Sequence, residues 1–405
     1  MTEIAADTER PSIMKFIKAN IRDYALLLSL LAIMVFFQFT TKGILFTPLN
    51  MTNIILQNSY IVIMALGMLL IIVAGHIDLS VGFLSGFIGA IAGVVMVNNP
   101  LWPAELRLGT FPAIALCLLV GTAIGALQGW FVAKFKIPAF IVTLAGMLIF
   151  RGLMIAMLSG RNLGPFPTSF QAISNGYVPD LLSFMAPQGI NMLALAVGVI
   201  VTALILWSNW RSRTLEESHG MAEEPMELFY GRNVLMAVAF LGFSWIMANH
   251  KGLPNVLVTM FALVALFMFV TTRTTFGRRV YAMGGNEKAT KLSGINTERV
   301  TIAIFAIMGA LAAFAGLVYA ARLNSAQPKA GAGLELDVIA ACFIGGAAVT
   351  GGVGKITGVV IGAFIMGVMN NGMGIMGVGI DWQQVIKGAV LMLAVFLDVY
   401  YKNKG

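Results

Sequence analysis

Six polar side chains within or beside apolar stretches are the residues of this sequence that could act on a solute. They are Asp78, Gln128, Arg151, Asn370, Asn371 and Gln384. Carboxylate, guanidinium and amide groups form hydrogen bonds with hydroxyl groups, and uncharged amides are less costly to remove from water than charged groups. We therefore expect these residues to line a path for a neutral, hydroxyl-rich solute.

Each of these residues also has a purely structural interpretation. Asp78 suits the N-cap of a helix, and so do Glu335 and Asp337. The amides could instead join helices through hydrogen bonds. Arg151 lies so deep in an apolar stretch that an unpaired charge there would cost roughly 2.5 to 3.5 kcal/mol, so it needs a partner or water. Lys387 is nearer the end of its stretch and is expected to extend its ammonium group to the membrane surface.

The sequence contains no phosphate-binding, serine-hydrolase or zinc-protease motif that would indicate an enzyme. The nearest approach to a phosphate-binding loop is at Gly354-Lys355, where Val349 replaces the first glycine and Ile356 the hydroxyl residue. No Gly-x-Ser-x-Gly or His-Glu-x-x-His motif occurs. Three His and two Cys are too few for a Cys/His zinc cluster. We expect no enzyme activity of its own, no cofactor and no bound metal.

The stretch from Gly284 to Ile295 has the clearest local structure signal. Asn286 suits an N-cap, Glu287 the positive start of a helix, Lys291 its negative end and Gly294 a left-handed stop. The pattern predicts a helix of about two turns over residues 286–293, too short to be stable alone in water. It must dock on something, either as a rigid knob that receives a push from a soluble partner or as an ordinary amphipathic connector.

The composition requires these residues to be positioned by helices in a membrane. Of the 405 residues, 59% are hydrophobic and 11% are charged, where about 25% charged is normal for soluble domains. So few charges could not cover a soluble surface, so lipid must be the solvent for much of the chain. The formal net charge of +8 comes from basic residues scattered over loops, which does not indicate a nucleic-acid partner.

A window of roughly 17 to 25 apolar residues finds about twelve candidate spans, which predicts an all-α polytopic membrane helix bundle of about 10–12 transmembrane helices. The first six are Tyr24–Phe39, Ile54–Ala74, Leu79–Val97, Phe111–Ala133, Ala139–Leu158 and Gly189–Trp207. The second six are Val234–Ala248, Pro254–Thr272, Val300–Ala320, Val338–Thr350, Ile356–Gly374 and Gln384–Tyr400.

Basic residues set the expected orientation. With both termini in the cytoplasm, loops placed inside contain more Lys and Arg than loops placed outside. The predicted regions are a cytoplasmic segment 1–23, a first transmembrane half 24–207, an acidic cytoplasmic loop 208–233, a second half 234–400 containing the helix 286–293, and a cytoplasmic tail 401–405. The segment Ser159–Gln188 is too rich in proline for a span and suits an outer cap or a partner surface.

Glycines recur in two of the predicted spans at intervals that suit helix packing. They are Gly82, Gly86, Gly89 and Gly93 in one, and Gly354, Gly358, Gly362 and Gly367 in the other. Small residues let helix backbones approach closely in lipid, so both spans are expected to pack tightly.

The stretch Gly284–Ile295 resembles the coupling loop of permease subunits from ABC importers of the ribose, xylose and multiple-monosaccharide type. Further matches follow in the same order at Ile77–Gly82, Ile137–Leu144, Phe150–Gly152, Asp337–Ala341, Gly345–Gly346, Gly351–Gly354, Asn370–Gly372 and Trp382–Gly388. His76, Thr290 and Lys355 depart from the residues usual in the family and leave the sugar undetermined. The extra length around 208–233 is more similar to xylose and multiple-sugar permeases.

This resemblance implies a multi-pass permease of the bacterial inner membrane that passes a monosaccharide of the xylose, glucose, galactose, arabinose or ribose class inward. It also implies a second copy of the chain, a periplasmic sugar-binding protein outside, a cytoplasmic ABC ATPase subunit inside and surrounding lipid. The residues that would couple to the ATPase are Gly285, Asn286, Glu287, Lys288, Ala289, Lys291, Leu292, Ser293 and Gly294.

Two other functions remain open at this point. One is an ABC permease for another small solute, such as branched-chain amino acids. The other is a secondary sugar carrier, which the scarcity of ionisable groups inside the spans disfavours, because proton-coupled carriers need such groups at membrane depth.

Overall fold

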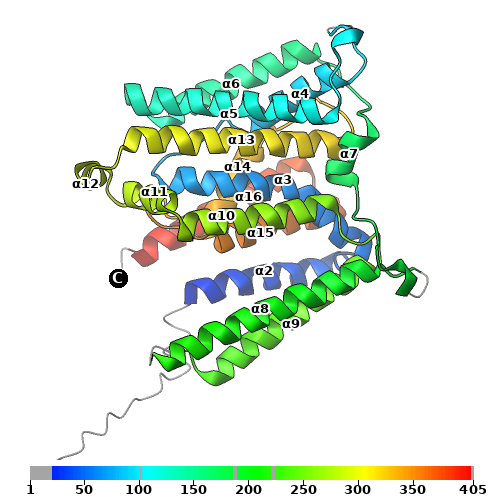
Figure 1. Ribbon diagram of the computed structural model, residues 1–405, viewed down its shortest axis with the longest axis vertical. Helices are drawn as coiled ribbons and strands as arrows, with labels where there is room; N and C mark the ends of the chain where they lie inside the picture. The colour runs from blue at the N-terminus through cyan, green and yellow to red at the C-terminus, as the bar shows by residue number, and fades with distance from the viewer. Residues whose placement is uncertain (1–20, 101, 186–188, 220–223, 403–405) are drawn as a thin grey trace, which may run out of the picture.

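The computed structural model describes residues 21–100, 102–185, 189–219 and 224–402, so the predicted terminal segments lie mostly outside the described residues. Within these ranges the chain forms helices, which lie roughly alongside one another, and two isolated β-bridges pair residues of the connecting segments (Figure 1). The first helices are α2 (Ile21–Thr40), α3 (Pro48–Val73), α4 (Val81–Met96), α5 (Thr110–Phe135), α6 (Ala139–Leu158), α7 (Thr168–Asn175), α8 (Met192–Ser218) and α9 (Met226–Ala248). The others are α10 (Asn255–Arg273), α11 (Thr275–Gly285), α12 (Glu287–Leu292), α13 (Thr297–Leu323), α14 (Leu334–Ile344), α15 (Ile356–Ile375) and α16 (Ile380–Lys402). The predicted all-α bundle is confirmed.

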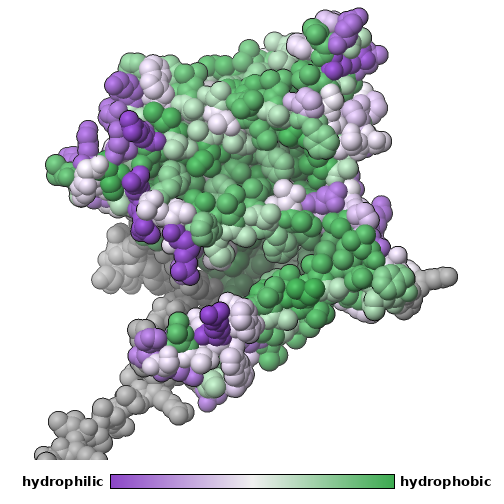
Figure 2. Space-filling view, in the orientation of Figure 1, coloured by the Kyte–Doolittle hydropathy of each residue, from purple (hydrophilic) through white to green (hydrophobic). Residues whose placement is uncertain are grey.

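Eight of these helices are long and apolar enough to cross a membrane. They are α3, α5, α6, α8, α9, α10, α13 and α15. Two shorter apolar helices, α4 and the part of α2 from Ala25 to Thr40, lie among them. Figure 2 shows a broad hydrophobic band across the bundle, with hydrophilic residues gathered at the two ends of the helices. A band of this kind matches a bilayer, so the chain is a multi-pass membrane protein.

The predicted span Val338–Thr350 is wrong. Helix α14 has 11 residues, about 16 Å at 1.5 Å per residue, or half of a hydrocarbon core roughly 30 Å thick. It ends at Gly345, and α15 starts only at Ile356. A window of hydropathy does not detect this break, because the glycine-rich turn between α14 and α15 is itself apolar.

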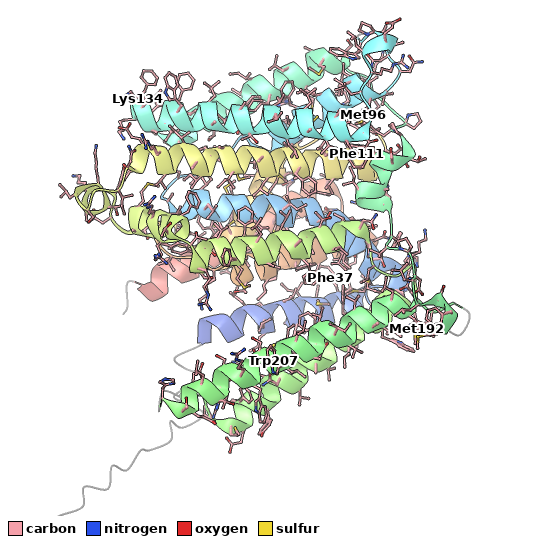
Figure 3. All side chains as sticks on the ribbon, viewed as in Figure 1. Phe37, Met96, Phe111, Lys134, Met192 and Trp207 are labelled. Atoms are coloured by element: carbon pink, nitrogen blue, oxygen red, sulfur yellow. The ribbon has the colours of Figure 1, made fainter. Side chains whose placement is uncertain are left out.

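Residues 208–233, expected to form a loop, are mostly helical in the described ranges. Helix α8 continues to Ser218, and α9 begins after Pro225. Figure 3 places Trp207 partway along α8, with the helix continuing beyond it. The cause is local, since Arg213 pairs with Glu217 one turn later at 2.7 Å and neither glycine nor proline interrupts this part of α8. The α8–α9 hairpin lies at one edge of the bundle (Figure 1).

Helix α3 forms the centre of the bundle, with 94% of its most apolar window buried. It packs against α13, α14 and α15, and α13 packs in turn most extensively against α5. The predicted tight packing of the glycine-rich spans is confirmed. Gly86 and Gly93 of α4 face Ala330 and Ala326 in the connection from α13 to α14, and Gly362 of α15 faces Ala341. These close approaches let segments of α4, α14 and α15 meet backbone to backbone.

The proline-rich segment Ser159–Gln188 contains no span in its described part, as expected. Its helix α7 packs on α13 and α10 at the end of the bundle opposite α12 (Figure 1). Asn175 donates hydrogen bonds to the carbonyl oxygens of Ala321 and Arg322, at 3.2 and 3.1 Å. The segment therefore supplies hydrogen-bond donors to carbonyl groups in the last turn of α13, where such groups lack a partner within the helix.

Candidate functional site

The predicted short helix at residues 286–293 is confirmed as α12. Asn286 is its N-cap and accepts a hydrogen bond from the N–H of Ala289 at 2.9 Å. Gly294 has a φ of +84°, a backbone conformation that a residue with a side chain rarely adopts. Asn296 caps the next helix, α13, by accepting from the N–H of Arg299 at 3.0 Å. Only the loop from Ser293 to Asn296 separates α12 from α13.

Helix α12 projects from one end of the bundle and is largely uncovered (Figure 1). Only Thr290 is buried, and its hydroxyl group donates to the carbonyl oxygen of Asn286. Leu292 is 89% exposed at the tip. A helix of six residues is marginally stable by itself, and the exposed Leu292 makes little apolar contact within this chain.

Helix α11, which the sequence analysis missed, connects α12 to the bundle. Thr274 caps it by accepting from the N–H of Gly277 at 3.2 Å, a signal of the Thr-x-x type that was present in the sequence. Gly284 lies directly against the carbonyl oxygen of Val73, at the end of α3, so that a Cβ there would collide with it. That carbonyl also accepts from the N–H of Gly352 at 2.8 Å.

The turn from α14 to α15 is part of the same contact. The hydroxyl group of Tyr281 in α11 donates to the carbonyl oxygen of Gly354 at 2.6 Å. Helices α11 and α12 are thus joined through backbone contacts to the end of α3 and to the turn between α14 and α15.

Asp78 and Gln128 are brought together, but Asp78 is not an N-cap. Helix α4 starts at Val81 and its N-cap is Ser80, which makes no capping bond through its side chain. Asp78 accepts from both the N–H and the hydroxyl of Ser80, at 2.8 and 2.7 Å. Gln128 donates to the same hydroxyl oxygen at 3.1 Å. The cap prediction fails because α4 begins at Val81, so that Ser80 and not Asp78 occupies the N-cap position. All three side chains are buried.

Asn371 lies between α15 and α3. It exchanges hydrogen bonds with Asn50 at 3.0 and 3.1 Å and donates to Gln57 at 3.4 Å. These bonds are those of an interhelical polar pair, the structural interpretation that the sequence left open.

Lys387 does not extend to the membrane surface, contrary to the prediction. Its ammonium nitrogen lies 3.0 Å from Asp337 Oδ1 and 3.1 Å from Oδ2, and its side chain is 16% exposed. Asn370 donates to Asp337 Oδ2 at 3.1 Å. Because α14 is a half-helix, Asp337 in its first turn provides a counter-charge within reach of α16. The ammonium group of Lys387 is more stable beside this buried carboxylate than it would be in contact with lipid.

Glu335 is the most unusual side chain of this cluster. It is 5% exposed, and its Oε2 has no hydrogen-bond partner among the described residues. The buried Oδ1 of Asn370 has none either. Neither Glu335 nor Asp337 caps α14, whose N-cap is Gly333, so those cap predictions are wrong. Gln384 of α16 is the side chain nearest to a Cβ built on Gly333, at 3.9 Å.

Arg151 is exposed on α6, with its guanidinium carbon 5.5 Å from the centre of the Phe83 ring. The described residues offer it no ion pair. Phe83 directly follows Gly82, against which Glu335 Oε2 packs. Arg151 and Glu335 therefore approach the same turn of α4 from two different elements. The described residues contain no group of three His, Cys, Asp or Glu side chains able to hold a metal ion.

Comparison with known proteins shows similarity along almost the whole chain. Residues 50–395 match the family model described as branched-chain amino acid transport system / permease component. The xylose transport system permease protein XylH of Escherichia coli K12 is 39% identical over 386 residues, 95% of this chain and 94% of that protein. XylH of Haemophilus influenzae is 37% identical over 390 residues, 96% of this chain and 99% of that protein.

A ribose permease is also similar. The ribose import permease protein RbsC of Escherichia coli K12 is 34% identical over 383 residues, which are 95% of either chain. No solved structure matches.

Proposed function

The chain belongs to the family described as branched-chain amino acid transport system / permease component, and from this premise we propose that it is the permease subunit of an ABC importer for a monosaccharide. The observation that carries the proposal is its similarity over nearly its full length to permeases named for xylose and ribose. The family description mentions amino acids, but these full-length relatives favour a sugar of the xylose or ribose class.

The proposed assembly places the chain in a bacterial inner membrane, surrounded by lipid, as a pair of identical subunits. A periplasmic sugar-binding protein docks outside and a cytoplasmic ABC ATPase inside. The permease hydrolyses no ATP itself, since the sequence has no phosphate-binding loop. Alternating access is then a shift between two packings of one bundle, driven by the ATPase.

We further propose that α12 and its ends receive the motion of the ATPase. The residues concerned are Gly285, Asn286, Glu287, Lys288, Ala289, Lys291, Leu292, Ser293 and Gly294. The exposure of Leu292 and the capping of α12 at both ends support a rigid contact surface. The contacts of Gly284 and Tyr281 support transmission from α12 to the turn between α14 and α15.

For the translocation path, the structure favours some of the six expected residues over others. Asp78, Gln128 and Asn371 have hydrogen-bond partners within the bundle. Arg151 is exposed at membrane depth, where lipid around an unpaired guanidinium would cost roughly 2.5 to 3.5 kcal/mol. We propose that it faces water or the second subunit, and that the path follows this side of α4.

The path then includes Asn370 of α15 and Gln384 of α16, which lie near Asp337 and Gly333 at the start of α14. This placement agrees with transporter architecture in general, in which binding positions lie where helices are broken near the midplane.

Reconstitution tests the proposed function. The chain is placed in liposomes with its ATPase and binding protein, and monosaccharides and branched-chain amino acids are screened for stimulated ATP hydrolysis and for uptake. We expect one sugar of the xylose or ribose class to stimulate both. Uptake of sugar that needs an ion gradient and no ATPase would instead show a secondary carrier, and stimulation by amino acids alone would show the other permease class.

A further inference from the structure

The first turn of α14 contains an acceptor that the bundle leaves unused. Glu335 Oε2 is buried without a hydrogen-bond partner in the described chain, and Asn370 Oδ1 is in the same condition. Asp337 lies two residues after Glu335 in the same turn of α14 and accepts a hydrogen bond from Asn370 at 3.1 Å. A buried acceptor without a donor is costly, so such groups need a functional or solvent explanation.

The position of Glu335 depends on a glycine in another helix. A Cβ on Gly82 would collide with Glu335 Oε2 and with the carbonyl oxygen of Gly331. Gly82 lies in the first turn of α4, and Glu335 in the first turn of α14. Two shortened helices thus meet here with their N-terminal ends, which carry partial positive charge.

From these contacts, and building on the proposed sugar import, we propose that Glu335 Oε2 accepts a hydrogen bond from a hydroxyl group of the monosaccharide when α4 and α14 separate. In this structure α4 and α14 pack closely, so Glu335 is not accessible to a sugar. The turn after α14 contacts α11, so motion of α12 reaches the helix that carries Glu335.

The chemistry of the cluster suits a polyol. Lys387 already forms an ion pair with Asp337 at 3.0 Å. Hydroxyl groups both donate and accept, and the cluster offers carboxylate oxygens as acceptors with ammonium and amide groups as donors. A transient set of such bonds satisfies a sugar without holding it tightly, as a conducting path requires.

The test compares Glu335→Gln with the wild-type chain in the complete importer in liposomes. Glutamine keeps the size of the side chain and removes its charge. Uptake of D-xylose is compared with uptake of its 2-, 3- and 4-deoxy analogues, each at a concentration that saturates the binding protein. We expect the wild-type importer to move one deoxy analogue about tenfold more slowly than xylose, the effect of losing a hydrogen bond to a charged group.

In Glu335→Gln this ratio should fall toward one, while uptake of xylose itself falls about tenfold. The matched control is Glu216→Gln, an exposed glutamate at the far end of α8, which should keep the wild-type ratio and rate. An unchanged ratio in Glu335→Gln would overturn the inference, even if overall uptake fell. If the wild-type importer moved no sugar at all, the proposed function itself would fail, and this inference with it.

Discussion

At the scale of single residues, the bundle handles its charged groups in three different ways. Lys387 and Asp337 form a buried ion pair supported by Asn370. Arg151 lies over an aromatic ring without an ion pair among the described residues. Glu335 keeps one oxygen without a donor in the described chain. Of these three arrangements, only the ion pair is complete among the described residues, and for this reason we proposed a solute for Glu335 and water or a second copy for Arg151.

The ion pair provides the first prediction. Lys387→Met should lower the free energy of unfolding by about 3 to 5 kcal/mol, because Asp337 would remain buried without its counter-charge. Thermal unfolding in detergent measures the change as a lower Tm. The double variant Lys387→Met with Asp337→Asn should regain much of this loss. A double variant no more stable than the single one would argue against the pair as the cause.

His76 provides a prediction about pH. Burial lowers its pKa below the ordinary value of 6.5, Glu287 opposes this shift and Lys136 adds to it. The folded chain therefore binds the proton less well than the unfolded chain. The stability that depends on neutral His76 is complete above about pH 6.5 and is lost as the pH falls below that value.

The measurement is Tm between pH 7.5 and 5.5. The decrease in Tm should be smaller in His76→Gln than in the wild-type protein. Replacing the exposed His219 by Gln serves as the control and should leave the wild-type decrease unchanged. Equal decreases in all three proteins would refute this role of His76.

At the scale of elements, the proposed functional residues lie on or beside two short helices, and long helices pack around them. Helix α12 has six residues and α14 has 11, and both end in glycine-containing turns. Each is stabilised by tertiary contacts, since helices of this length are marginal alone. Helix α11 links α12 to the turn that follows α14, because the hydroxyl group of Tyr281 donates to the carbonyl oxygen of Gly354.

The proposed coupling role of α12 provides the third prediction. Leu292→Asp should abolish sugar uptake while leaving the protein in the membrane, because the proposed apolar contact with the ATPase would be replaced by a charge. Gly294→Pro should do the same, since proline cannot adopt a φ of +84°. Uptake and membrane content are measured together.

Asn286→Ala serves as a graded comparison for these two variants. It should weaken association with the ATPase by only about 1 kcal/mol, the value of a lost cap. Normal uptake by Leu292→Asp and Gly294→Pro would contradict the coupling role of α12.

At the scale of the whole molecule, the helices form a central bundle around α3 with a separate hairpin, α8–α9, at its edge (Figure 1). The hairpin is apolar and exposed along much of its length, as lipid-facing helices are. Helix α6 is also largely exposed, but it carries Arg151. The exposed face of α6 thus carries a charge, whereas the apolar part of the α8–α9 hairpin carries none. This difference indicates that α6 and the hairpin have different surroundings.

Cysteine labelling distinguishes these surroundings. Cys117 and Cys342 are buried, so they are first replaced by alanine and the protein is checked for uptake. A cysteine at Gly152, where an added Cβ meets nothing within 4 Å, should react with a charged thiol reagent or form a crosslink between two copies. Val199→Cys on α8 should do neither. A Gly152→Cys protein that gives neither product would contradict the proposed placement of Arg151.

The sequence by itself determined the membrane class, most spans and the whole of α12. These features depend on local quantities, namely the length of an apolar run and the residues that cap a helix. Asn286 and Gly294 were sufficient to predict α12, because the N-cap residue Asn286 and its hydrogen-bond partner Ala289 lie only three residues apart. The family resemblance added the function, which the comparisons support.

Only the tertiary structure decided how the polar residues are partnered. Lys387 finds Asp337 across 50 residues, and Asn371 finds Asn50 across 321. Helix α14 ends at Ile344, and the next residue, Gly345, packs against the carbonyl group of Gly358 in α15, a contact between two elements that no single stretch of sequence records. Charge, length and capping are properties of a segment, whereas burial and pairing are properties of the assembled bundle.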